Sequence, residues 1–132
     1  MVSKKFGIIK TSEVWSGEIL VSDDVLIPEG VEVKIIPGTK IRFLKKKYKS
    51  SIWQYQKFEQ YESKGFYIIV RGKLIAEGNE DKKIFIGNKK WNGGIVIIDG
   101  CLEFSFCEIK YANNALYGIK SNIVVKNCIL NN

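Results

Sequence analysis

Two segments near the end of the chain repeat each other at a constant offset. LEFSFCEIKY, which begins at Leu102, aligns without a gap on IVVKNCILNN, which begins at Ile123. The offset is 21 residues throughout, and it superposes Cys107 on Cys128. A repeat of about 20–25 residues made of short strands and turns is the period of a solenoid. This repeat limits the folds open to the chain more than any other feature.

Segments further upstream continue the same apolar columns. From RGKLIAEG and KKIFIGN the column members are Leu74, Ala76 and Ile86, and from GVEVKIIPGTKIRF they are Val33, Ile35 and either Ile41 or Phe43. Within a unit the apolar residues lie two apart, which turns them all to one side of a strand. Stacked units bury each column against its copies, and crossovers between parallel strands are right-handed. The sequence therefore predicts an all-β fold, a right-handed parallel β-helix (solenoid) of about four coils.

The 132 residues suffice for a single domain with its own core. We expect a first coil over residues 14–43, an insertion over 44–65, a second coil over 66–90, a third over 91–112 and a last coil over 113–132. The last coil has no polar cap after it, and an uncapped solenoid end exposes strand edges and apolar side chains. We therefore expect a truncated chain, a second copy stacked end to end, or cover by the insertion.

Several short motifs spread over most of the chain match one known family. They are PGT at Pro37–Thr39, GKLIAEG at Gly72–Gly78, KIF at Lys83–Phe85, WNGGI at Trp91–Ile95 and CEIKYA at Cys107–Ala112. Together they resemble the right-handed parallel β-helix repeat proteins of the pectate-lyase-like solenoid superfamily, of the envelope or surface type. The resemblance implies a structural or glycan-contacting protein of the cell envelope or exterior. It also admits a polysaccharide-cleaving enzyme, because the same coil carries lyases and hydrolases.

Residue types limit the chemistry. The chain has no histidine, which excludes a Ser-His-Asp triad and a histidine-ligated metal within it. Its three cysteines form no CxxC pair. The outward columns do not gather acids: the column of Glu103 reads Lys34, Ile75, Glu103, Val124, and that of Glu108 reads Arg42, Phe85, Glu108, Ile129. We predict no catalytic residue, no metal and no cofactor.

Two segments begin with tryptophan, a polar residue and glycine: WSG at Trp15 and WNG at Trp91. We interpret each as the entry into a coil, with glycine allowing a tight or left-handed turn and the indole covering the coil edge. Trp91 is also a candidate for stacking on a sugar. Met1–Lys10 lacks the features of a signal peptide, and no window is apolar enough to span a membrane.

The insertion combines basic and aromatic side chains, in a chain whose net charge is +7. With Trp91, the candidate ligand-binding residues are Lys45, Lys46, Lys47, Lys49, Trp53, Tyr55, Phe58 and Tyr61. Lys40 and Arg42 extend the basic run toward the N-terminus. Cations with flat rings suit an anionic polysaccharide, which we favour, or single-stranded nucleic acid. Alternatively, the rings pack on the solenoid while the lysines remain solvated.

The sequence favours a non-catalytic β-helix module with a structural or ligand-binding role, contacting an anionic polysaccharide at the cell surface. The first alternative is a fragment of a polysaccharide lyase or glycoside hydrolase whose acids lie in other coils. A β-sandwich adhesion domain is the third interpretation.

Overall fold

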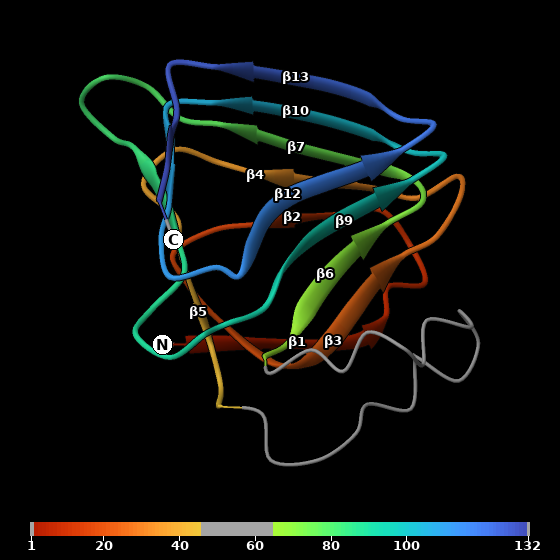
Figure 1. Ribbon diagram of the computed structural model, residues 1–132, viewed down its shortest axis with the longest axis horizontal. Coiled ribbons are helices and arrows are strands. Elements are labelled where there is room, and N and C mark those ends of the chain that lie inside the picture. The colour runs from red at the N-terminus through yellow and green to blue at the C-terminus, as the bar shows by residue number, and fades with distance from the viewer. Residues whose placement is uncertain (1, 46–64, 132) are drawn as a thin grey trace.

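The computed structural model describes residues 2–45 and 65–131, which form strands and turns without a helix (Figure 1). The strands are β1 (Val2–Ile8), β2 (Glu13–Trp15), β3 (Glu18–Ile27), β4 (Glu32–Ile35), β5 (Lys40–Phe43), β6 (Tyr67–Val70), β7 (Lys73–Glu77), β8 (Ile84–Ile86), β9 (Gly94–Ile98), β10 (Cys101–Ser105), β11 (Cys107–Ile109), β12 (Asn114–Ile119), β13 (Asn122–Lys126) and β14 (Ile129–Leu130). Over these ranges no helix is long and apolar enough to cross a membrane.

The strands form two sheets in which every pair is parallel. One sheet has the order β12-β9-β6-β3-β5-β8-β11-β14, with β1 also paired to β3, and the other has the order β13-β10-β7-β4-β2. From β4 onward each strand pairs with the strand three places later in the chain, and Figure 1 shows β4, β7, β10 and β13 lying in sequence. The all-β class and the parallel pairing agree with the prediction. They exclude an antiparallel β-sandwich for the residues described.

The long strand β3 joins two of these strand positions. Its first part, residues 18–21, pairs with β5, and its last part, residues 25–27, pairs with β6. Asp23 and Asp24 lie between the two parts, where the strand changes partner. The buried Asp24 carboxylate accepts a hydrogen bond from the Tyr67 N–H at 2.6 Å, so this acid connects the bend to β6.

The predicted inward column through β10 is confirmed. Leu102 pairs with Leu74 on one side and with Ile123 on the other, within one parallel sheet. Val33 continues the column on β4. Outward, Glu103 lies between Ile75 and Val124, as the alignment of the repeats predicted.

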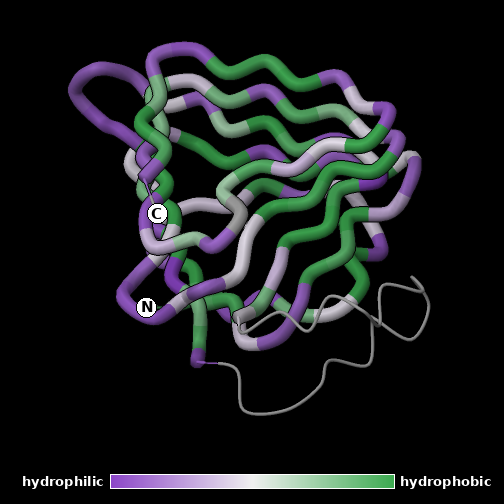
Figure 2. The backbone as a smooth tube through the Cα atoms, viewed as in Figure 1, coloured by the Kyte–Doolittle hydropathy of each residue, from purple (hydrophilic) through white to green (hydrophobic). Residues whose placement is uncertain are grey.

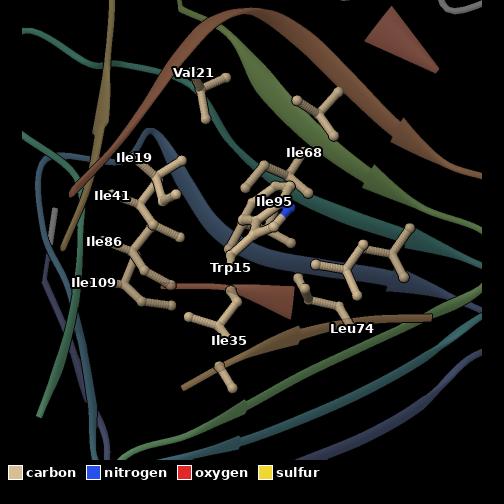
Figure 3. Packing of buried hydrophobic residues seen from close by; sticks show 14 of the residues in the cluster. Trp15, Ile19, Val21, Ile35, Ile41, Ile68, Leu74, Ile86, Ile95 and Ile109 are labelled. Carbon is tan, nitrogen blue, oxygen red and sulfur yellow. The ribbon is translucent and has the colours of Figure 1, made fainter. Parts of the chain in front are cut away.

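A second inward column settles the choice between Ile41 and Phe43. Figure 3 shows Ile19, Ile41, Ile86 and Ile109 in a row, one from each neighbouring strand. Ile41 is therefore the column member. This shifts the outward residues of β5 by two positions, so the neighbour of Phe85 is Lys40, and the predicted placement of Arg42 in that column is wrong.

Trp15 and Trp91, the tryptophans of the WSG and WNG motifs, belong to the core instead of covering a coil edge. The Trp91 ring stacks on Phe43 with centroids 3.9 Å apart, and its Nε1–H donates to the Phe66 carbonyl oxygen at 2.7 Å. The glycines that follow differ in role. Gly17 has a φ of 73°, whereas a Cβ on Gly93 would overlap the Phe66 carbonyl oxygen.

Strand β1 was not predicted, and it ends the core on the N-terminal side. Paired along β3, it places Ser3, Lys5 and Gly7 beside inward residues of that strand. The Lys5 ammonium lies 3.1 Å from a Glu13 carboxylate oxygen and 5.7 Å from the centroid of the Trp15 ring. The N-terminal end of the apolar columns therefore has a polar, charge-paired cover, as solenoid caps commonly do.

Truncating Leu102, which lies between Leu74 and Ile123 in the first column, tests this packing. Leu102→Ala should lower the free energy of unfolding by about 2–5 kcal/mol, because the side chain is fully buried and the strands around it relax only partly. Val14→Ala should change the free energy of unfolding by less than about 0.5 kcal/mol, because Val14 lies on the edge strand β2 and its side chain is 61% exposed. Denaturant unfolding measures both, and equal losses would contradict the column.

Candidate functional site

The outer surface of β3, β5 and β8 contains an open hollow of about 410 Å³. Its charged and aromatic lining residues are Glu18, Lys40, Arg42 and Phe85. Alternation along β5 explains the two cations: Ile41 and Phe43 are buried, so Lys40 and Arg42 point outward. The hollow is therefore the outward counterpart of the second apolar column.

Strand register places three different side chains side by side. Lys40 pairs with Glu18 of β3 on one side and with Phe85 of β8 on the other. Neighbouring strands lie about 4.8 Å apart, so a carboxylate, an ammonium and an aromatic ring follow one another across the sheet. Phe85 is 39% exposed, which leaves part of its ring open to a ligand. Arg42 stands two residues further along β5, roughly 7 Å from Lys40.

Asn88 and Gly87 form the end of the hollow. The Asn88 side chain accepts a hydrogen bond from the Phe43 N–H at 2.7 Å and donates to the Phe43 carbonyl oxygen at 3.1 Å. It thereby pairs with β5 as a backbone strand would. Gly87 has a φ of 114°, and a Cβ there would overlap the Lys110 carbonyl oxygen. Both residues support the wall, and the Asn88 amide is already occupied.

Of the predicted site residues, the structure describes Lys45 and Trp91. Lys45 is exposed just after β5. Lys46, Lys47, Lys49, Trp53, Tyr55, Phe58 and Tyr61 lie outside the described residues. Trp91 is only 1% exposed, and its ring face and its N–H both make contacts within the core.

Glu18 and Phe85 were not among the predicted site residues. The repeats did place Phe85 in an outward column, beside Glu108. Lys40 was predicted only as part of the basic run, and Arg42 was predicted beside Phe85, where the structure places Lys40 instead. The signal that could have found the hollow is an aromatic residue in an outward position beside a basic strand.

Acidic residues do not gather on the described surface. Within the described part of the chain, Glu18 is the one carboxylate that lines the hollow. Within residues 2–45 and 65–131, no group of three or more Cys, Asp or Glu side chains is placed to hold a metal ion. Glu80 and Asp81 lie in the connection between β7 and β8, which Asn79 closes by accepting hydrogen bonds from the Asp81 and Lys82 N–H groups.

Cys107 and Cys128 are free thiols in adjacent repeats. The Cys107 N–H donates to the Cys128 sulfur at 3.4 Å, and the single S–H of Cys107 has the carbonyl oxygens of Ala76 and Ser105 as its two possible acceptors, at 3.5 and 3.4 Å. Burial first, and the neighbouring Cys128 second, raise the pKa of Cys107 to about 12. The thiol therefore stays protonated near neutral pH, which suits packing and not nucleophilic or metal chemistry.

Comparison of the chain with protein-family models, with curated proteins and with solved structures finds no match. The candidate site is therefore defined by its own geometry.

The raised pKa of Cys107 predicts slow alkylation. At about pH 8 its thiolate fraction should be on the order of one part in ten thousand, so iodoacetamide should modify it far more slowly than the partly exposed Cys101. Mass spectrometry of the native protein locates the label on each cysteine. Equal labelling rates for the two residues would show that Cys107 is neither buried nor protonated as described.

Proposed function

We propose that the two parallel sheets close into a right-handed β-helix. Support comes from the return of the chain to the same strand position at every third strand and from the in-register apolar columns. Right-handedness follows from the strong preference of parallel crossovers for that hand.

We further propose that the module binds an acidic polysaccharide on the hollow of β3, β5 and β8, without cleaving it. The observation that carries the proposal is the row of Glu18, Lys40 and Phe85, with Arg42 beside it. An arginine guanidinium pairs with a carboxylate through two parallel hydrogen bonds, and lysine adds a point charge. The exposed Phe85 ring offers an apolar surface to a sugar ring, and Glu18 can accept hydrogen bonds from hydroxyl groups.

Polysaccharide is favoured over nucleic acid because, among the residues that the structure describes, the hollow offers one exposed ring, that of Phe85. Proteins that bind single strands usually stack successive bases on several aromatic side chains. An anionic sugar chain needs cations and a limited apolar contact, which the described surface supplies. A place on the cell surface is part of this proposal and rests on the resemblance of the sequence motifs.

Binding is favoured over cleavage because a single carboxylate, that of Glu18, lines the hollow among residues 2–45 and 65–131. Glycosidases of the usual kind need two carboxylates on either side of the scissile bond. The alternative of a lyase or hydrolase fragment makes a separate prediction: acidic polysaccharide would be shortened, with or without calcium. We expect no release of unsaturated or reducing ends from polygalacturonate under either condition.

Replacing the two cations tests the site. The double variant Lys40→Ser, Arg42→Ser should bind polygalacturonate about tenfold or more weakly at low salt, because each charged hydrogen bond contributes roughly 1.5–3 kcal/mol before screening. The matched control is Lys34→Ser, Lys82→Ser, which removes the same charge from exposed positions outside the hollow. Calorimetry or affinity electrophoresis measures the dissociation constant.

Phe85→Ala distinguishes binding of the polysaccharide at the hollow from general electrostatic attraction to a basic protein. It should weaken binding to polygalacturonate with no change in net charge, whereas a merely charged surface would not respond. Equal losses in the hollow variant and the control variant would place the attraction in the total charge of +7 and would overturn the site.

A further inference from the structure

The two ends of the apolar columns differ in how they are covered. At the N-terminal end, Lys5 and Glu13 form an ion pair over Trp15. At the other end, β13 carries Ile123, Val124 and Val125 with exposed fractions of 40%, 44% and 37%. Ile129, Leu130 and Tyr117 of the neighbouring strands are exposed as well. Figure 2 shows the apolar stretch of this outermost strand, bounded by polar ends.

The free edge of β13 has a definite hydrogen-bonding pattern. Among the described strands β13 pairs with β10 alone. The Asn122 N–H donates a hydrogen bond to the Gly100 carbonyl oxygen, and the Lys126 carbonyl oxygen accepts one from the Phe106 N–H. The even-numbered residues of β13 therefore direct their backbone groups toward β10. Because these directions alternate along a strand, the N–H and C=O groups of Ile123 and Val125 point to the open edge.

We propose that a second copy of the chain covers this end, tail to tail, with β13 pairing antiparallel to its own copy about Val124. A two-fold axis normal to the sheet places Ile123 opposite Val125 of the other copy. These are the residues whose backbone groups point outward from the edge, so they form hydrogen-bonded pairs on both sides of the axis. The two Val124 residues then form the close pair between them, with Cα atoms about 4.5 Å apart.

The side chains fit this register. The rotation keeps inward residues inward, so Ile123 and Val125 of both copies continue one apolar column across the interface. The strand reads polar, apolar, apolar, apolar, polar from Asn122 to Lys126, which is symmetric about its centre. Lys126 faces Asn122 of the other copy, so the only charge on the strand does not meet its equivalent.

Head-to-tail stacking is the less favourable arrangement. It would bring β1 against the open end and place Ser3 and Lys5 in the apolar columns. Burying an ammonium there costs free energy that the existing Glu13 pair does not recover in full. A tail-to-tail contact is also closed, which predicts dimers and no filaments. The proposal does not depend on polysaccharide binding.

Sedimentation equilibrium of the full chain tests the proposal. We expect a dimer that dissociates on dilution and forms no larger species. Val124→Glu should raise the dissociation constant about tenfold or more, because two carboxylates would then oppose each other in the close pair. Val124→Thr, which keeps a branched side chain, and Val14→Glu, at the exposed N-terminal edge, should leave it nearly unchanged.

A gain of affinity tests the register itself. Asn122→Glu should lower the dissociation constant by about two- to thirtyfold, because it places a carboxylate opposite Lys126 twice in each dimer. The gain should disappear at high salt. A wild-type chain that stays monomeric at the highest concentrations reached would overturn the proposal. A dimer whose dissociation constant is unchanged by Val124→Glu would also overturn the proposal, as would oligomers that grow in size with concentration. Circular dichroism of every variant verifies that the fold is retained.

Discussion

The parallel, in-register stacking of inward side chains is the interaction on which the other features of this structure depend. Leu74, Leu102 and Ile123 occupy equal positions in successive strands, and each buries its neighbour. Burying a leucine or isoleucine side chain contributes about 1.5–3 kcal/mol, and a shift of one residue would turn the whole column to solvent. The columns therefore determine which residues of every strand point outward.

The stacking of the inward residues also determines which outward side chains lie next to one another on the surface. Because Ile41 is held between Ile19 and Ile86, Lys40 must stand beside Glu18 and Phe85. Apart from Gly87 and Asn88 at one end, the proposed ligand site needs no loop among the described residues to assemble it. It follows from residues placed at outward positions of three adjacent strands, which the core keeps at strand spacing. The same regularity leaves Ile123 and Val125 in line with the columns beneath them, and so creates the apolar edge of β13.

Much of the core could be predicted from the sequence, because each inward residue has apolar equivalents one repeat away. The errors arose where hydrophobicity carries no information. Ile41 and Phe43 are both apolar, so a shift by two residues preserves the pattern, and only the register of the strands decides between them. Strand β1 was missed because Ser3, Lys5 and Gly7 replace the expected apolar residues. The indole of Trp91 resembles a surface ligand platform in sequence, but its partners Phe43 and Phe66 are 48 and 25 positions away, beyond local patterns.

Methyl nuclear Overhauser effects in the protein labelled at Leu, Val and Ile methyl groups test the stacking most directly. The structure predicts that the Leu102 methyl groups give cross-peaks to both Leu74 and Ile123, which are distant in sequence and adjacent in the column. Cross-peaks from Leu102 to Ile97 in an antiparallel β9–β10 pairing, without those to Leu74 and Ile123, would contradict it.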